Sequence, residues 1–141
     1  MCLVAYIAAR QALPLIGWDP AAPAFHVRED DAGIAQVRGH FRLPFVYYIG
    51  SHTGCGCGFN SLDANADAGQ PESSHRTLAA LGEYLRAAVA QAGPLELYTC
   101  WDRDEAGTIE HHLTVGVNNF NADMQWFPER THVTIVAEPS P

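Results

Sequence analysis

A run of leucine and small apolar residues between residues 72 and 92 constrains the fold more than any other feature. Its apolar positions recur at steps of three and four, as on one face of an α-helix: Leu78, Leu81, Leu85, Ala88, Val89 and Ala92. Ser73 or Ser74 is suited to cap the start, and Gly93-Pro94 ends the pattern. A helix with one apolar face must cover another layer, which the rest of the chain has to supply.

Segments with strand character lie on both sides of this helix. Residues 2–9 are continuously apolar, which suits a strand buried on both faces. Further strands are predicted from branched and aromatic residues or from alternation: 25–28, 44–50, 95–101, 110–117 and 131–138. Residues 31–41 fit a short helix, which we favour, or a strand, and residues 110–117 also carry turn residues. The pattern does not decide either segment.

This order of elements predicts one domain over residues 1–141 of the α+β class. We expect a single mixed or antiparallel sheet, with the long amphipathic helix (about 72–92) packed on one face. The hydrophobic share of 48% is that of a globular chain and is sufficient for a core without disulfides.

The charge balance excludes several classes of partner. The chain has sixteen acidic residues and eight basic ones, all of them arginine, so its formal net charge is −8. Phosphate backbones and anionic membrane surfaces attract clustered basic residues, so we expect neither nucleic acid nor membrane as a partner. A homo-oligomer or a protein partner is left open, and Trp18, Trp126 and Phe127 would mark such a surface if exposed. The apolar start stops at Arg10 and lacks a basic leader, which favours a cytoplasmic location with reduced thiols.

The stretch "GSHTGCGCGF", from Gly50 to Phe59, carries the main chemical signal. Its glycines let the backbone bend, and Cys55 and Cys57 project to one side if the segment is extended. Both sulfur atoms can then reach one ion, with His52 as a third ligand. Thiolates select zinc or another thiophilic metal such as copper(I). A fourth ligand would come from Cys100 or His75, which the sequence does not place.

Two other hypotheses compete with a metal-binding module. In a thiol-dependent enzyme or redox protein, His52 and the glycine N–H groups would lower the pKa of Cys55 or Cys57. In a non-catalytic interaction protein, the same loop is a structural turn under which the two cysteines pack. The sequence alone does not decide whether the protein is an enzyme.

The remaining polar motifs are interpreted as structural. Residues 63–69 alternate acids and amides as a calcium loop does, but depart from that pattern at two positions and are predicted to be a solvated loop. Cys2 is expected to pack in the core, and His111 and His112 to lie on the surface. The acidic residues in "WDRDEAG", residues 101–107, are expected to form a solvated turn.

Overall fold

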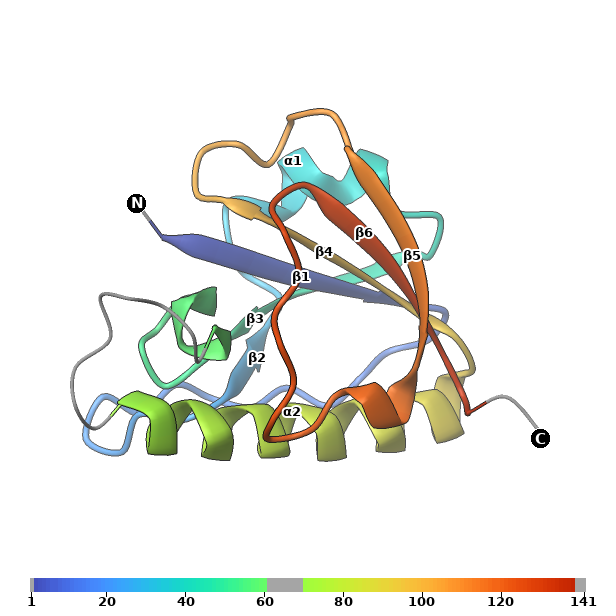
Figure 1. Cartoon of the computed structure of the whole chain (residues 1–141). Coiled ribbons are helices and arrows are strands. Elements are labelled where there is room, and N and C mark those ends of the chain that lie inside the picture. Colours follow the sequence, from blue (N-terminus) through green and yellow to red (C-terminus); the bar gives the residue numbers. More distant parts are fainter. Residues whose placement is uncertain (1, 61–69, 139–141) are drawn as a thin grey trace.

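The computed structural model describes residues 2–60 and 70–138 of the chain. Within them, six strands form one sheet with a long helix against one face (Figure 1). The main elements in chain order are β1 (Leu3–Ala9), β2 (His26–Arg28), α1 (Ile34–Val37), β3 (Phe45–Gly50), α2 (Gln70–Ala92), β4 (Leu95–Trp101), β5 (His111–Gly116) and β6 (Thr131–Val136). Three short 3₁₀ turns accompany them: η1 (Arg38–His40), η2 (Gly56–Phe59) and η3 (Val117–Asn119).

The sheet is mixed, and its strand order is β2-β3-β1-β4-β6-β5. β1 lies inside the sheet, antiparallel to both β3 and β4, and β6 is antiparallel to β4. β5 forms one edge and runs parallel to β6. The predicted α+β class, with a mixed sheet and a long helix on one face, is therefore confirmed.

The face of the sheet that α2 covers holds the larger hydrophobic core. The α2 side chains of Leu78, Leu81 and Leu85 are fully buried there. They belong to one cluster with Leu97 of β4 and Ile135 of β6. Burying a leucine or isoleucine side chain stabilises the fold by about 1.5–3 kcal/mol relative to leaving it exposed. The leucine spacing in the sequence thus identifies the contact between helix and sheet.

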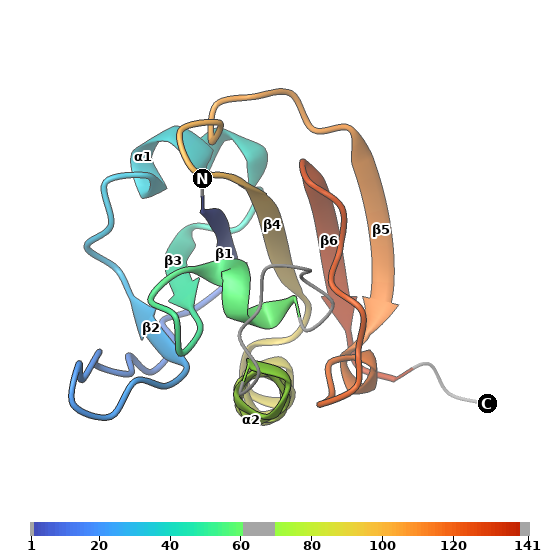
Figure 2. The same cartoon turned by 60° about the vertical axis from the view of Figure 1, so that its left-hand side comes forward.

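The opposite face of the sheet carries a smaller core. Side chains of β1, β3 and β4 pack there beneath α1, among them Tyr6, Tyr48 and Tyr98. Figure 2 shows α1 and α2 on opposite sides of the sheet. Residues 31–41 therefore contain the short helix that we favoured. Among the described residues, no helix lies over the part of this face formed by β5 and β6 (Figure 2).

Several local expectations are corrected. α2 begins at Gln70, so Ser73 and Ser74 lie inside its first turns instead of capping it; a proline at position 71 is tolerated there because the first-turn N–H groups have no helical partner. Glu105 is buried instead of solvated, and its carboxylate accepts a hydrogen bond from the Arg103 N–H at 3.2 Å.

The aromatic residues considered for a partner surface are divided between core and surface. Trp126 is buried, and its indole N–H donates to Thr99 Oγ1 at 3.2 Å. Trp18 is exposed and lies against the ring of His26. Residues 63–69 lie outside the described residues. No helix in the described part of the chain is both long enough and apolar enough to span a membrane.

Candidate metal centre

The loop after β3 is organised by Ser51. The Ser51 N–H donates to the Cys55 carbonyl at 2.8 Å, and the Ser51 hydroxyl donates to the same carbonyl at 2.6 Å. The hydroxyl oxygen also accepts the Gly58 N–H at 3.1 Å. Gly54 has a φ of +91°, a backbone conformation that glycine adopts without steric cost. These bonds fold the chain back on itself directly after the strand, which places both loop cysteines near the sheet.

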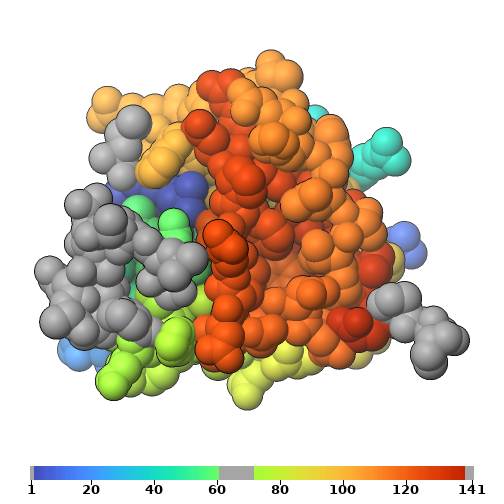
Figure 3. Space-filling model, in the orientation of Figure 1, coloured from blue at the N-terminus to red at the C-terminus, as the bar shows by residue number. Residues whose placement is uncertain are grey.

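Two of the loop glycines are required by close packing. A Cβ atom at Gly58 would collide with the side chain of Ser51, and one at Gly56 would lie 3.0 Å from the carbonyl oxygen of Leu3. Gly56 therefore allows the loop to approach the start of β1. In Figure 3 the start of β1 (blue) and the loop around η2 (green) lie next to each other at the surface.

This approach brings together three cysteines. The Sγ atoms of Cys2, Cys55 and Cys57 all lie within 4.8 Å of one another. The antiparallel register Ala5↔Ile49 sets the start of β1 beside the end of β3, from which the loop leaves. Cys2 is exposed, and the two loop cysteines are half-buried. The expectation that Cys2 packs in the core is therefore wrong.

Hydrogen-bond donors surround the sulfur atoms. The Leu3 N–H donates to Cys57 Sγ at 3.2 Å, and the Cys57 N–H donates to Cys55 Sγ at 3.5 Å. Thr53 Oγ1 lies 3.6 Å from Cys55 Sγ. Donors of this kind stabilise a thiolate relative to a thiol.

The three thiols differ in acidity. Hydrogen bonds from the Cys57 thiol, the Cys57 N–H and the Thr53 hydroxyl lower the pKa of Cys55 to about 5. The pKa of Cys57 is raised because its thiol donates to Cys55, and the pKa of Cys2 is raised for the same reason. Cys55 is therefore the most acidic of the three thiols, because the other two donate hydrogen bonds to its sulfur atom.

The other residues proposed as ligands from the sequence are not among the three whose ligand atoms all lie within 4.8 Å of one another. His52 is in the same loop, where its Nδ1 lies 2.9 Å from Thr77 Oγ1 of α2. Cys100 is buried in the smaller core on the opposite face of the sheet, and this burial raises its pKa to about 12. His75 is exposed on α2. The structure thus joins Cys55 and Cys57 to Cys2, which no local pattern in the sequence marked as a ligand.

Comparison with protein-family models, with curated proteins and with solved structures finds no match to this chain. The indication of a function therefore comes from the three cysteines and the hydrogen-bond donors around them.

Proposed function

We propose that this protein binds a thiophilic metal ion through Cys2, Cys55 and Cys57. The observation that carries the proposal is the mutual approach of their three sulfur atoms within 4.8 Å. Zinc–sulfur bonds are about 2.3 Å long, so two sulfur ligands of one tetrahedral ion lie roughly 3.8 Å apart. Small side-chain rotations therefore suffice to bring all three atoms onto one ion.

The electrostatics of the cluster support this function. Cys55 offers a ready thiolate at neutral pH, and an incoming ion displaces the protons of the other two thiols. The N–H groups of Leu3 and Cys57 then remain to support the thiolate charges, as outer donors do in metal sites. Cys2 is exposed, so an ion reaches the cluster from solvent. Three soft ligands favour zinc, copper(I) or another thiophilic metal.

Metal titration of the reduced protein tests the proposal. We expect one zinc or copper(I) ion per chain, with a sulfur-to-metal charge-transfer band for copper(I). Because only one of the three thiols is ionised at neutral pH, zinc binding at pH 7 should release about two protons into a weak buffer. The Cys55→Ser/Cys57→Ser variant should lose this binding.

The matched control is Cys100→Ala, which removes the cysteine that lies outside the cluster. It should bind the ion with unchanged stoichiometry. Equal metal binding by the double serine variant and the unchanged protein would contradict the proposal. A double variant that loses only stability, in a protein that never binds metal, supports the structural-turn hypothesis instead.

The low pKa of Cys55 favours a second candidate function, thiol-based redox chemistry. With hydrogen peroxide as the oxidant, the Cys55 thiolate attacks one oxygen, forms a sulfenic acid and releases hydroxide. The thiol of Cys2 or Cys57 then attacks that sulfur, which forms a disulfide and releases water. We expect iodoacetamide to modify Cys55 at neutral pH well before Cys100. Equally slow modification of all four cysteines would exclude this function.

A further inference from the structure

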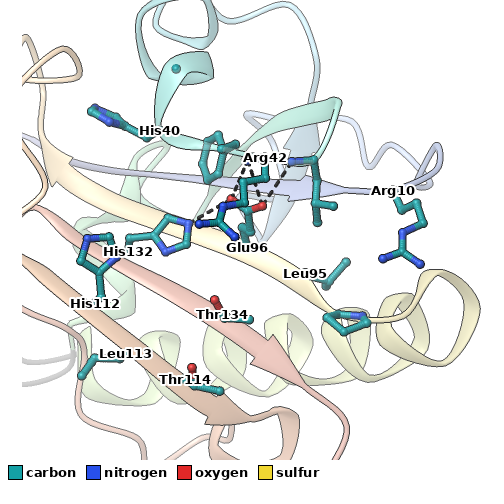
Figure 4. A pocket seen from close by; sticks show the side chains of 14 residues that line it. Arg10, His40, Arg42, Leu95, Glu96, His112, Leu113, Thr114, His132 and Thr134 are labelled. Atoms are coloured by element: carbon teal, nitrogen blue, oxygen red, sulfur yellow. Dashed lines mark hydrogen bonds and ion pairs between the residues drawn. The ribbon is translucent and has the colours of Figure 1, made fainter.

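A groove with a volume of about 680 Å³ lies on the face of the sheet that α2 does not cover (Figure 4). Side chains of β4, β5 and β6 line it, together with residues 39–43 and Arg10 beyond the end of β1. Small-molecule sites commonly have volumes of about 300–1,000 Å³. The groove and the cysteine cluster use different residues, so an inference about one does not depend on the other.

A buried carboxylate fixes one wall of the groove. Glu96 is 5% exposed, and its carboxylate accepts the N–H groups of Arg42 at 3.0 Å and Leu43 at 3.2 Å. It also accepts His132 Nε2 at 2.9 Å. A buried charge is tolerated only when it is well paired, and these donors come from two separate segments, residues 42–43 and β6. Glu96 therefore holds the backbone at Arg42 and the ring of His132 in place before any ligand arrives.

The lining of the groove has the opposite charge to the molecule as a whole. The chain carries a formal net charge of −8, yet Arg10 and Arg42 both line this groove and both are exposed. Among the described residues that line the groove, Glu96 is the single acidic one, and it is engaged by the donors described above. In Figure 4, His112 and His132 lie on one side of Glu96 and Arg10 on the other. A positive groove on an acidic protein attracts small anions.

Apolar side chains line the same groove. Phe41 and Leu43 contribute to it, and both are half-buried. The hydroxyl groups of Thr114 and Thr134 add uncharged hydrogen-bonding groups. Cationic and apolar groups in one groove match a ligand that has both characters.

We propose that this groove binds a small organic acid, with its carboxylate or phosphate group at Arg10 and Arg42. The apolar part of that acid lies on Phe41 and Leu43. Charge-assisted hydrogen bonds from a guanidinium group to such oxygens are among the strong ones in proteins.

Titration with hexanoate, followed by amide chemical shifts in NMR spectra, tests the proposal. We expect saturable shifts at residues 42–43, 112–114 and 132–134, and weaker binding of hexylammonium, 1-hexanol and inorganic phosphate. Arg42→Ala and Arg10→Ala should each weaken hexanoate binding by about tenfold, because each removes a charge-assisted contact. Phe41→Ala should weaken it by a few fold.

The control is Arg76→Ala, which removes an exposed arginine from α2 and should leave the affinity unchanged. Circular dichroism of the arginine variants checks that the exposed substitutions preserve the fold. Three results would overturn the proposal: hexylammonium or 1-hexanol binding as tightly as hexanoate, unchanged affinity in both groove arginine variants, or shifts confined to α2. Inorganic phosphate binding as tightly as hexanoate would overturn the apolar part of the assignment.

Discussion

The two faces of the sheet are built from alternate residues of the same strands, yet they differ in character. On β4, Leu97 points into the large core beneath α2, whereas its neighbours Glu96 and Tyr98 lie on the other face. The helix face is closed by apolar packing, and the other face is only partly covered and retains buried polar groups. The contrast teaches that the core beneath α2 accounts for much of the stability. The opposite face is then available for polar side chains.

The largest expected loss of stability comes from a cavity in the core beneath α2. Leu81→Ala should lower the free energy of unfolding by about 2–5 kcal/mol, because it leaves a cavity in a fully buried position. Thr114→Ala, at an exposed position of the face that α2 does not cover, should change it by no more than about 0.5 kcal/mol. Urea unfolding followed by circular dichroism measures both values. Similar losses in the two variants would show that the two faces do not differ in this way.

On the face that α2 does not cover, substitution of the single residue Glu96 should lower the free energy of unfolding by nearly as much. Glu96→Ala removes the acceptor of two backbone N–H groups and of His132, so we expect a loss of about 2–3 kcal/mol. Glu83→Ala, at an exposed position of α2, is the matched control and should change stability by no more than about 0.5 kcal/mol. The same unfolding measurements apply. If the two glutamate variants are equally stable, the carboxylate of Glu96 does not hold the groove wall.

The sulfur atom of Cys55 is half-buried, whereas the carboxylate of Glu96 is buried. Ionisation of Cys55 should make the free energy of unfolding depend on pH. The pKa of Cys55 falls from an ordinary 9.0 to about 5 on folding, so between these values the unfolded chain binds more protons. Its contribution to stability therefore increases as pH rises from 5 towards 9 and disappears as pH falls through 5.

Reduced, metal-free protein should show this trend relative to its Cys55→Ser variant. From pH 5 to pH 8 we expect the difference in unfolding free energy to grow by about 1–2 kcal/mol, a value already reduced for the solvent exposure of the thiol. Unfolding curves at the two pH values measure it. A difference that stays constant with pH would show that Cys55 is not ionised in the folded protein.

The smallest expected changes in stability come from two tyrosines of the smaller core, Tyr48 and Tyr98. The Tyr48 hydroxyl donates to the Gly54 carbonyl at 2.9 Å, so Tyr48→Phe should cost about 1 kcal/mol. Among the described residues the buried Tyr98 hydroxyl has no hydrogen-bond partner. Tyr98→Phe should therefore leave the stability unchanged or raise it by up to about 1 kcal/mol. Thermal unfolding distinguishes these outcomes, and a clear loss in Tyr98→Phe would show that this hydroxyl is paired.

Local patterns in the sequence were sufficient to predict the long helix and the first strand. The spacing of Leu78, Leu81 and Leu85 identifies both the long helix and its buried face, because a helix repeats every 3.6 residues. The apolar run at residues 2–9 likewise predicts a strand that is buried throughout, as β1 is. Both features depend only on neighbours along the chain.

Local sequence patterns did not predict which distant segments pair with one another. Cys2 joins Cys55 and Cys57 because β1 and β3 pair in one particular register, which local patterns do not encode. His112 and His132 come together through the parallel pairing of β5 and β6, so the groove also had no sequence signal. The "CGC" spacing identified two of the three clustered cysteines, and the third depended on tertiary structure.

The inside position of β1 has a consequence for the order of folding. β1 precedes both of its partner strands, and the bond from Thr99 Oγ1 to the Val4 carbonyl spans 95 positions along the chain. Contacts at such separation slow folding, because a long loop must close before they form. During synthesis β1 has to wait for β4, and Cys2 joins the other two cysteines only when β1 docks beside β3. Metal uptake through the proposed cluster would therefore report that β1 has docked beside β3.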